Sequence, residues 1–117
     1  MEWGSSTLPD WGISLQPGNK AVIFVHYLNE LDEMSREEYA HMDSETLRVA
    51  SSLPGYLGHE FSQTPMGTIF ISYWENDQAV VGWAHHPLHR EAKEKGRAVW
   101  YAEHRSLICT IDRVMGS

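Results

Sequence analysis

The sequence predicts one α+β domain whose elements follow the order βαββαβ, and three observations lead to this prediction. Runs rich in β-branched and aromatic residues at 21–28 and 68–74 are typical of strands. Apolar residues spaced three and four apart between residues 35 and 52 indicate an amphipathic helix. A chain of 117 residues has room for one hydrophobic core but not for two.

The first strand, residues 21–28, reads AVIFVHYL and is mainly apolar on both faces. Alternation places His26 on the same face as Phe24 and Leu28. A strand that is buried on both faces needs helices on one side and another layer on the other. A second copy of the sheet would supply that layer.

A helix follows from Ser35 to about residue 52. Ser35 and Glu38 have the spacing of a capping box, with Ser35 as the N-cap, and Pro54-Gly55 ends the helix. Its buried stripe is expected to contain Tyr39, Met42, Thr46, Val49 and Leu53.

Two further strands are predicted at 56–63 and 68–74, joined by a turn at 64–67. Asn76 is the predicted cap of a second helix. Pro87 should restart this helix after a break, because proline suits the first helical position.

The second helix is expected to run to about residue 105, and residues 107–114 form the fourth predicted strand. Right-handed crossovers turn the resulting order into a ferredoxin-like sheet with both helices on one face. The other face is apolar, which predicts a homodimer packed sheet to sheet. The domain covers residues 21–115, and residues 1–20 form an extension whose Trp3 and Trp11 should pack on something, such as a partner subunit.

The charge balance argues against a nucleic-acid partner. Lys and Arg total 9 against 16 acidic residues, for a net charge of −7. The one basic run, Arg90, Lys93, Lys95 and Arg97, alternates with glutamates and is interpreted as a solvated helix face.

Cys109, the single cysteine, cannot form an internal disulfide, so a reducing compartment is the expected setting. In a predicted strand it is more typical of a small buried apolar residue than of a nucleophile. The sequence contains no signal peptide and no stretch suited to spanning a membrane, so a cytoplasmic location without a membrane partner is expected.

Common enzyme motifs are absent: the sequence has no phosphate-binding glycine loop, GxSxG or CxxC. His85, His86 and His89 have spacings that would suit a metal on one helix, but Pro87 interrupts that helix, so no metal site is predicted. Two roles remain for His26: a hydrogen-bonded core residue, or a base that works near pH 7.

Trp83 lies on the inward stripe of the second helix. Two roles remain for it: a core residue, or a wall for a flat ligand. Around it the chain resembles the antibiotic biosynthesis monooxygenase (ABM) family of dimeric α/β-barrel proteins. The matching motifs are SYW at 72–74, W-x-x-H-P-x-H at 83–89, GR at 96–97 followed by WY at 100–101, and PGYLG at 54–58.

The resemblance implies a ferredoxin-like homodimer with a β-barrel between its sheets and a pocket between sheet and second helix. Some members oxidise polycyclic phenols with O₂ and without metal or flavin, and others bind and degrade haem. Trp83 matches a site tryptophan of the family, and His89 falls where members place an aromatic pocket residue. His26 is the candidate base from the residues alone, independent of any motif.

Haem degradation in the family uses an Asn on the first strand and an axial His ten residues after the Trp. Here the tenth position holds Lys93, and Asn29 lies at the end of the strand. The sequence therefore favours a monooxygenase without cofactor that acts on a small, flat, electron-rich aromatic or quinol. Catalysis is assigned to His26, Trp83 and His89. A haem protein and a non-catalytic dimeric ligand-binding module are the alternatives.

Overall fold

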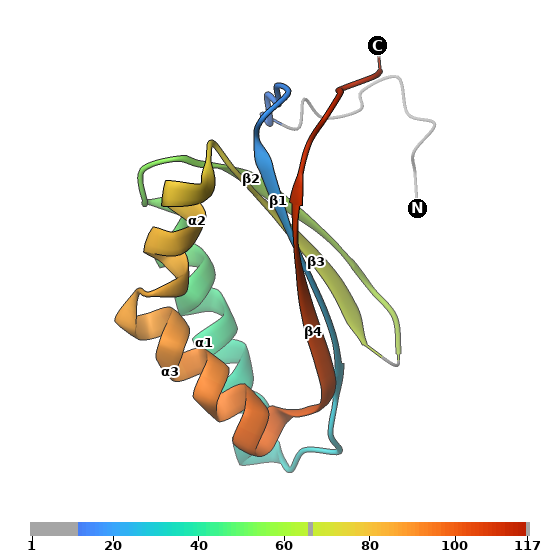
Figure 1. Ribbon diagram of the computed structural model, residues 1–117. Coiled ribbons are helices and arrows are strands. Elements are labelled where there is room, and N and C mark those ends of the chain that lie inside the picture. Colours follow the sequence, from blue (N-terminus) through green and yellow to red (C-terminus); the bar gives the residue numbers. More distant parts are fainter. Residues whose placement is uncertain (1–11, 66, 117) are drawn as a thin grey trace.

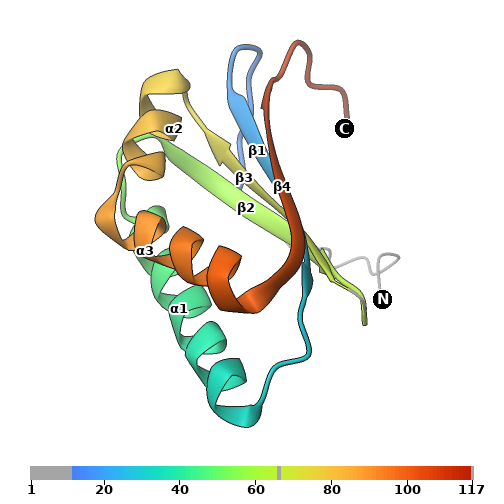
Figure 2. The same ribbon diagram turned by 60° about the horizontal axis from the view of Figure 1, so that its bottom comes forward.

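A computed structural model describes residues 12–65 and 67–116, so the roles expected for Trp3 and Trp11 lie outside the described residues. The chain forms a four-stranded antiparallel sheet in the order β2-β3-β1-β4. Figures 1 and 2 show the helices on one face of this sheet. The ferredoxin-like α+β prediction is confirmed. The elements are β1 (Lys20–Leu28), α1 (Glu33–Ser51), β2 (Tyr56–Gln63), β3 (Thr68–Trp74), α2 (Asp77–Ala84), α3 (Pro87–Lys95), the π-helical turn η1 (Gly96–Trp100) and β4 (Tyr101–Thr110).

The predicted capping box of α1 is wrong, because the helix begins one turn earlier. Asp32 is the N-cap, and its carboxylate accepts a hydrogen bond from the Ser35 backbone N–H at 2.7 Å. Ser35 therefore lies inside the first turn. A carboxylate is at least as good a cap as a serine hydroxyl and also complements the positive end of the helix dipole.

The second helical region matches its prediction at the start and departs from it at the end. The Asn76 side chain caps α2 by accepting from the Ala79 backbone N–H, and Pro87 opens α3. The helix does not continue to residue 105, because η1 ends it at Trp100 and β4 begins directly afterwards. His104, expected on a helix, therefore lies on a strand.

Pairing with β1 explains why β4 begins six residues before its predicted start. Its register runs from Leu28↔Tyr101 to Lys20↔Thr110. The first six residues of β4, YAEHRS, have no apolar alternation, so the sequence did not reveal this part of the strand. Cys109 is exposed, which corrects the expectation of a buried thiol.

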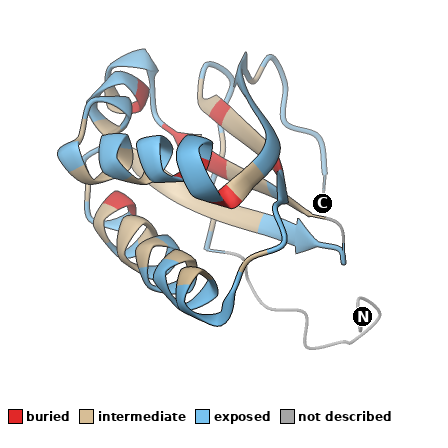
Figure 3. Cartoon of the chain, turned by 90° about the horizontal axis from the view of Figure 1, so that it is seen from below, coloured by how far each residue is buried: buried red, intermediate tan, exposed pale blue. Residues whose placement is uncertain are grey.

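Trp74 lies at the centre of the core between the sheet and the helices. It is fully buried and packs with buried Ala50 and Val80, and its indole N–H donates to the Ser72 hydroxyl at 2.9 Å. Figure 3 shows that the buried positions gather on the sides of the helices and strands that face one another. Partly buried Val22, Leu53, Tyr56, Ala79 and Trp83 pack around this core.

The opposite face of the sheet is apolar and largely uncovered. Tyr27, Ile69 and Leu107 are 40%, 47% and 47% exposed. Near its β2 edge, the side chain of Ile13 packs closely against the α-carbon of Gly58. Among the described residues, no helix is long and apolar enough to cross a membrane.

Gly55 lies in the turn between α1 and β2 and packs closely against Ala79 of α2. Its φ is +85°, and an added Cβ would lie 2.5 Å from the Ala79 Cβ. We expect Gly55→Ala to lower the free energy of unfolding by roughly 2 kcal/mol or more, measured by urea denaturation. Gly82→Ala is the control, because Gly82 lies in α2 with open space around it. It should raise the free energy of unfolding by about 0.5–1 kcal/mol.

Candidate functional site

Trp83 is the centre of a group of rings at the junction of α2 and α3. It lies nearly parallel to the core indole of Trp74, with ring centroids 6.4 Å apart, and remains partly exposed. The imidazoles of His86 and His89 lie 5.6 and 4.7 Å from it. The His86 Nδ1 accepts from the Leu88 backbone N–H at 3.1 Å, so His86 caps α3 and fixes the bend that Pro87 introduces.

His89 is held in its neutral form beside this indole. Burial is the largest effect and lowers the pKa of His89. The Ala84 carbonyl, 3.5 Å from Nδ1, acts in the opposite direction, and the charges of Lys93 and His86 add to the lowering of the pKa. A neutral imidazole packed on an indole presents a flat, weakly polar wall to a ligand.

His26 forms a second group of rings nearer the other end of β1. It is only 4% exposed, and its Nε2 lies 3.1 Å from the hydroxyl of Tyr39 on α1. The rings of Phe24 and Tyr101 lie 4.9 and 4.7 Å away. Burial, and to a smaller extent His104, lowers the pKa of His26, so the imidazole is neutral at pH 7. Within the described part of the chain, no group hydrogen-bonds to its buried Nδ1.

The tautomer of His26 follows from this arrangement. If Nε2 carries the proton, it donates to the Tyr39 oxygen, and Nδ1 keeps a free lone pair. The other tautomer would bury an unpartnered N–H, which is the costlier defect. The favoured form is therefore the one that can accept a proton at Nδ1. Burial and Asp43 raise the pKa of Tyr39 to about 12, so its hydroxyl stays protonated.

All three predicted site residues lie on the helix-covered side of the sheet, but they belong to two groups. Val22, on the same face of β1 as His26, packs against the core that Trp83 also contacts. Val22 and His26 are four positions apart along the strand, a distance of about 13 Å. Phe24 lies between them, and no ring contact among the described residues joins His26 to Trp83 or His89.

The helix-covered side of the sheet is open to solvent along β4. His104, Ser106 and Ile108 pair with His26, Phe24 and Val22, so their side chains share this face. All three are exposed, and Ile108 is 61% exposed. The β4 edge of this face is therefore exposed to solvent, whereas His26 itself is buried.

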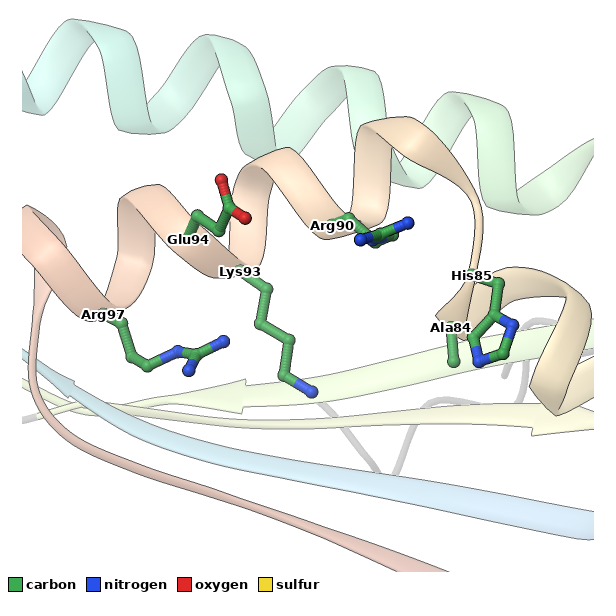
Figure 4. Close-up of a pocket in the computed structure, with 6 residues that line it drawn as sticks. All are labelled: Ala84, His85, Arg90, Lys93, Glu94 and Arg97. Carbon is green, nitrogen blue, oxygen red and sulfur yellow. The ribbon is translucent and has the colours of Figure 1, made fainter.

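A hollow of about 500 Å³ lies along α3 next to the Trp83 group. Figure 4 shows Lys93 and Arg97 extending from the helical arm toward the strands. All four cations of the basic run are exposed, as expected for a solvated helix face, and three of them also line this hollow. None of His26, Trp83 and His89 is part of its wall. The lining residues are Ala84, His85, Arg90, Lys93, Glu94 and Arg97.

Metal ligands do not converge in the described part of the chain. No group of three His, Cys, Asp or Glu side chains is placed to hold an ion there. His86 and His89 both turn toward Trp83, while His85 lines the hollow.

Tyr39 and Tyr101 are site residues that the sequence analysis did not identify as such. Tyr39 was expected only on the buried stripe of the first helix, and Tyr101 only within the second helix. The available signal was that a histidine facing a helix needs a polar partner on that helix, and Tyr39 is the tyrosine on the stripe. Tyr101 had no such signal, because its position depends on where η1 ends.

Comparison with known proteins identifies one relative of similar length. No family model matches the chain. This chain is 37% identical over 99 residues to the uncharacterized protein YqjZ of Bacillus subtilis (strain 168). The aligned residues make up 84% of this chain and 83% of YqjZ. The chain belongs to the YqjZ family.

Solved structures extend the likeness of this YqjZ-family protein to the fold of ABM-type monooxygenases. SnoaB, a cofactor-independent oxygenase from Streptomyces nogalater, superposes with a TM-score of 0.69 at 12% identity, over 86% of this chain and 99% of that one. A putative antibiotic biosynthesis monooxygenase from Bacteroides thetaiotaomicron gives 0.65 at 16% identity, over 86% and 97%. A dimeric ferredoxin-like protein of unknown function from Thermobifida fusca gives 0.68 at 12%, over 88% and 100%. At identities this low, these comparisons show only that the fold is shared.

The buried imidazole makes the stability of this YqjZ-family protein depend on pH. The folded chain keeps His26 neutral at pH values where the unfolded chain protonates it. The free energy of unfolding should therefore fall as the pH drops below about 6.5 toward the lowered pKa of the folded state. Urea denaturation between pH 8 and 5 should show a shallower fall in His26→Gln. The matched control His41→Gln, at an exposed position on α1, should keep the full slope. An unchanged slope in His26→Gln would contradict the assignment.

Proposed function

We propose that this protein is an ABM-type monooxygenase that oxidises a flat, electron-rich aromatic or quinol with O₂ and without metal or flavin. One observation carries the proposal: a neutral, buried imidazole with a free Nδ1 lies among aromatic rings on the open, helix-covered side of the sheet. The fold shared with SnoaB supports it.

The reaction needs two things from the protein: a base and an apolar surface that holds the substrate. His26 accepts the phenolic proton of the substrate at Nδ1, and the resulting imidazolium and phenolate attract one another in a site of low dielectric constant. The phenolate is rich enough in electrons to reduce O₂ by one electron, and the two radicals combine at a ring carbon. The ring peroxide then loses water to leave a quinone.

The overall reaction balances without an external reductant. A phenol and O₂ give a quinone and water, so one oxygen atom enters the ring and the other leaves as water. The four electrons that O₂ takes up come from the aromatic ring and its C–H and O–H bonds. The proton held by His26 returns in the water, which restores the neutral imidazole.

Trp83 and His89 serve in this proposal as the second wall of the site. A polycyclic substrate that lies along β1 over Phe24 would contact His26 at one end and the Trp83–His89 pair at the other. A single small ring would contact one group at a time. This geometry favours fused-ring substrates.

Haem degradation suits these residues less well. Lys93, at the position of the family's axial His, extends along the hollow beside Arg97. The Asn29 side chain donates to the Val99 carbonyl at 2.9 Å and so joins the end of β1 to η1. Neither the axial ligand nor the strand Asn of the family is therefore present in that role.

Oxygen uptake with a fused-ring phenol tests the proposal. We expect 1-naphthol to be consumed with one O₂ per naphthoquinone formed, in the presence of a chelator. His26→Gln should lower kcat by roughly 100-fold or more, the usual effect of losing a general base. Trp83→Phe should also lower the rate, and His41→Gln should leave it unchanged. Uptake that appears only after hemin is added would establish the haem alternative, and no uptake with a panel of phenols would favour a non-catalytic binding module.

We also propose that two chains pack sheet to sheet. The face that carries Tyr27, Ile69 and Leu107 is too apolar to remain in water in an isolated chain. Cross-strand pairs place Ile69 beside Val25 and Leu107 beside Ile23, so the exposed side chains continue a partly buried apolar surface. A second copy covers this surface without blocking the side of the sheet that holds His26.

Light scattering checks the dimer. The expected mass is about twice the 13.4 kDa of one chain. Ile69→Glu should shift the mass to that of a single chain, because the charge would be buried without a partner. Val81→Glu is the control, since Val81 is 51% exposed on α2 and should leave the dimer intact. A monomeric wild-type protein would contradict the proposal.

A further inference from the structure

We propose that the hollow along α3 is an anion site that binds the carboxylate or phosphate group of a ligand whose flat aromatic body lies against Trp83 and His89. The inference rests on the proposed function in one respect: it takes the Trp83–His89 pair as the wall for the aromatic body. It adds the chemical class of the ligand, an aromatic acid.

The charge of the hollow is the first observation. His85, Arg90, Lys93 and Arg97 line it against the single carboxylate of Glu94. Figure 4 shows the Glu94 side chain turned toward α1, away from the side on which Lys93 and Arg97 extend. Three of the nine Lys and Arg residues of a protein with a net charge of −7 thus line one recess.

The lack of internal partners is the second observation. Elsewhere in the described chain, Lys20 pairs with Asp77, Arg48 with Glu45 and Lys95 with Glu38, at 3.2, 2.8 and 3.6 Å. Within the same described residues, no carboxylate lies within ion-pair distance of Arg90, Lys93 or Arg97. Arg90, Lys93 and Arg97 follow one another at spacings of three and four residues, so their charges lie on one side of the helical arm and repel one another. An anion between them relieves that repulsion.

The size and donor chemistry of the hollow suit a small anionic group. About 500 Å³ lies within the range of small-molecule sites, roughly 300–1,000 Å³. An arginine guanidinium offers two parallel N–H donors to a carboxylate or phosphate, and a lysine ammonium adds a point charge. Arg97 and Lys93 provide one of each from neighbouring turns of the helical arm.

The hollow adjoins the aromatic group closely enough for one ligand to use both. Ala84 and His85 directly follow Trp83, and Lys93 lies one helical turn after His89. Lys93 is near enough to act electrostatically on the His89 imidazole. An acidic group held by Lys93 therefore leaves the attached ring system beside the Trp83–His89 pair.

Calorimetric titration with three naphthalene probes tests the site. We expect 1-naphthoate or 1-naphthyl phosphate to bind at least roughly tenfold more tightly than neutral 1-naphthol, the effect of about one charge-assisted hydrogen bond. The tighter of the two acids identifies the anionic group. Arg97→Gln and Lys93→Gln should remove this preference while binding of 1-naphthol stays unchanged. Glu94→Gln should strengthen binding of the acids.

Lys95→Gln is the matched control, because Lys95 lies on the same helix, pairs with Glu38 and does not line the hollow. It should leave all three affinities unchanged. Equal binding of the acids and 1-naphthol, or affinities that Arg97→Gln and Lys93→Gln do not alter, would overturn the anion site. Oxygen uptake is a separate readout: its absence alongside selective binding of the acids would reject the monooxygenase and leave the anion site standing.

Discussion

The antiparallel ladder between β1 and β4 is the constraint on which the candidate site depends. The strand β1 carries the imidazole of His26 and Phe24, β4 brings Tyr101 and His104 beside them, and α1 adds Tyr39. The same ladder fixes where the helical arm must end. Because Tyr101 pairs with Leu28, the chain has five residues of η1 in which to leave α3 and join the sheet.

The hydrophobic core positions the other half of the site. Trp74 is fully buried, and Trp83 packs almost parallel to it, so α2 cannot rotate without exposing the core indole. The hydrogen bond from the Trp74 N–H to the Ser72 hydroxyl satisfies the one polar atom of that ring. Packing of this kind gives Trp83 a fixed orientation at the edge of the core, with part of its side chain exposed.

The sequence revealed those parts of the fold that local physics determines. β2 and β3 have the predicted bounds, and Asn76 and Pro87 mark the helices as expected, because turn residues and apolar runs act over a few positions. The start of β4 could not be predicted, since YAEHRS favours a helix locally and becomes a strand only by pairing with β1, more than 70 residues away in the chain. The Asp32 cap was missed because Ser35 and Glu38 offered an equally good pattern nearby.

The five-residue turn η1 fixes the number of residues between α3 and β4. A π-helical turn accommodates one residue more than an α-helical turn would over the same rise. Here it brings Trp100 inward to 2% exposure, and Gly96 allows the Tyr101 ring to lie directly against the backbone. Deleting a single residue would rotate the following side chains by about 100° and carry the indole toward solvent. A substitution at an exposed position of η1 such as Val99 keeps this spacing, whereas an insertion or deletion there would displace the aromatic surroundings of the imidazole.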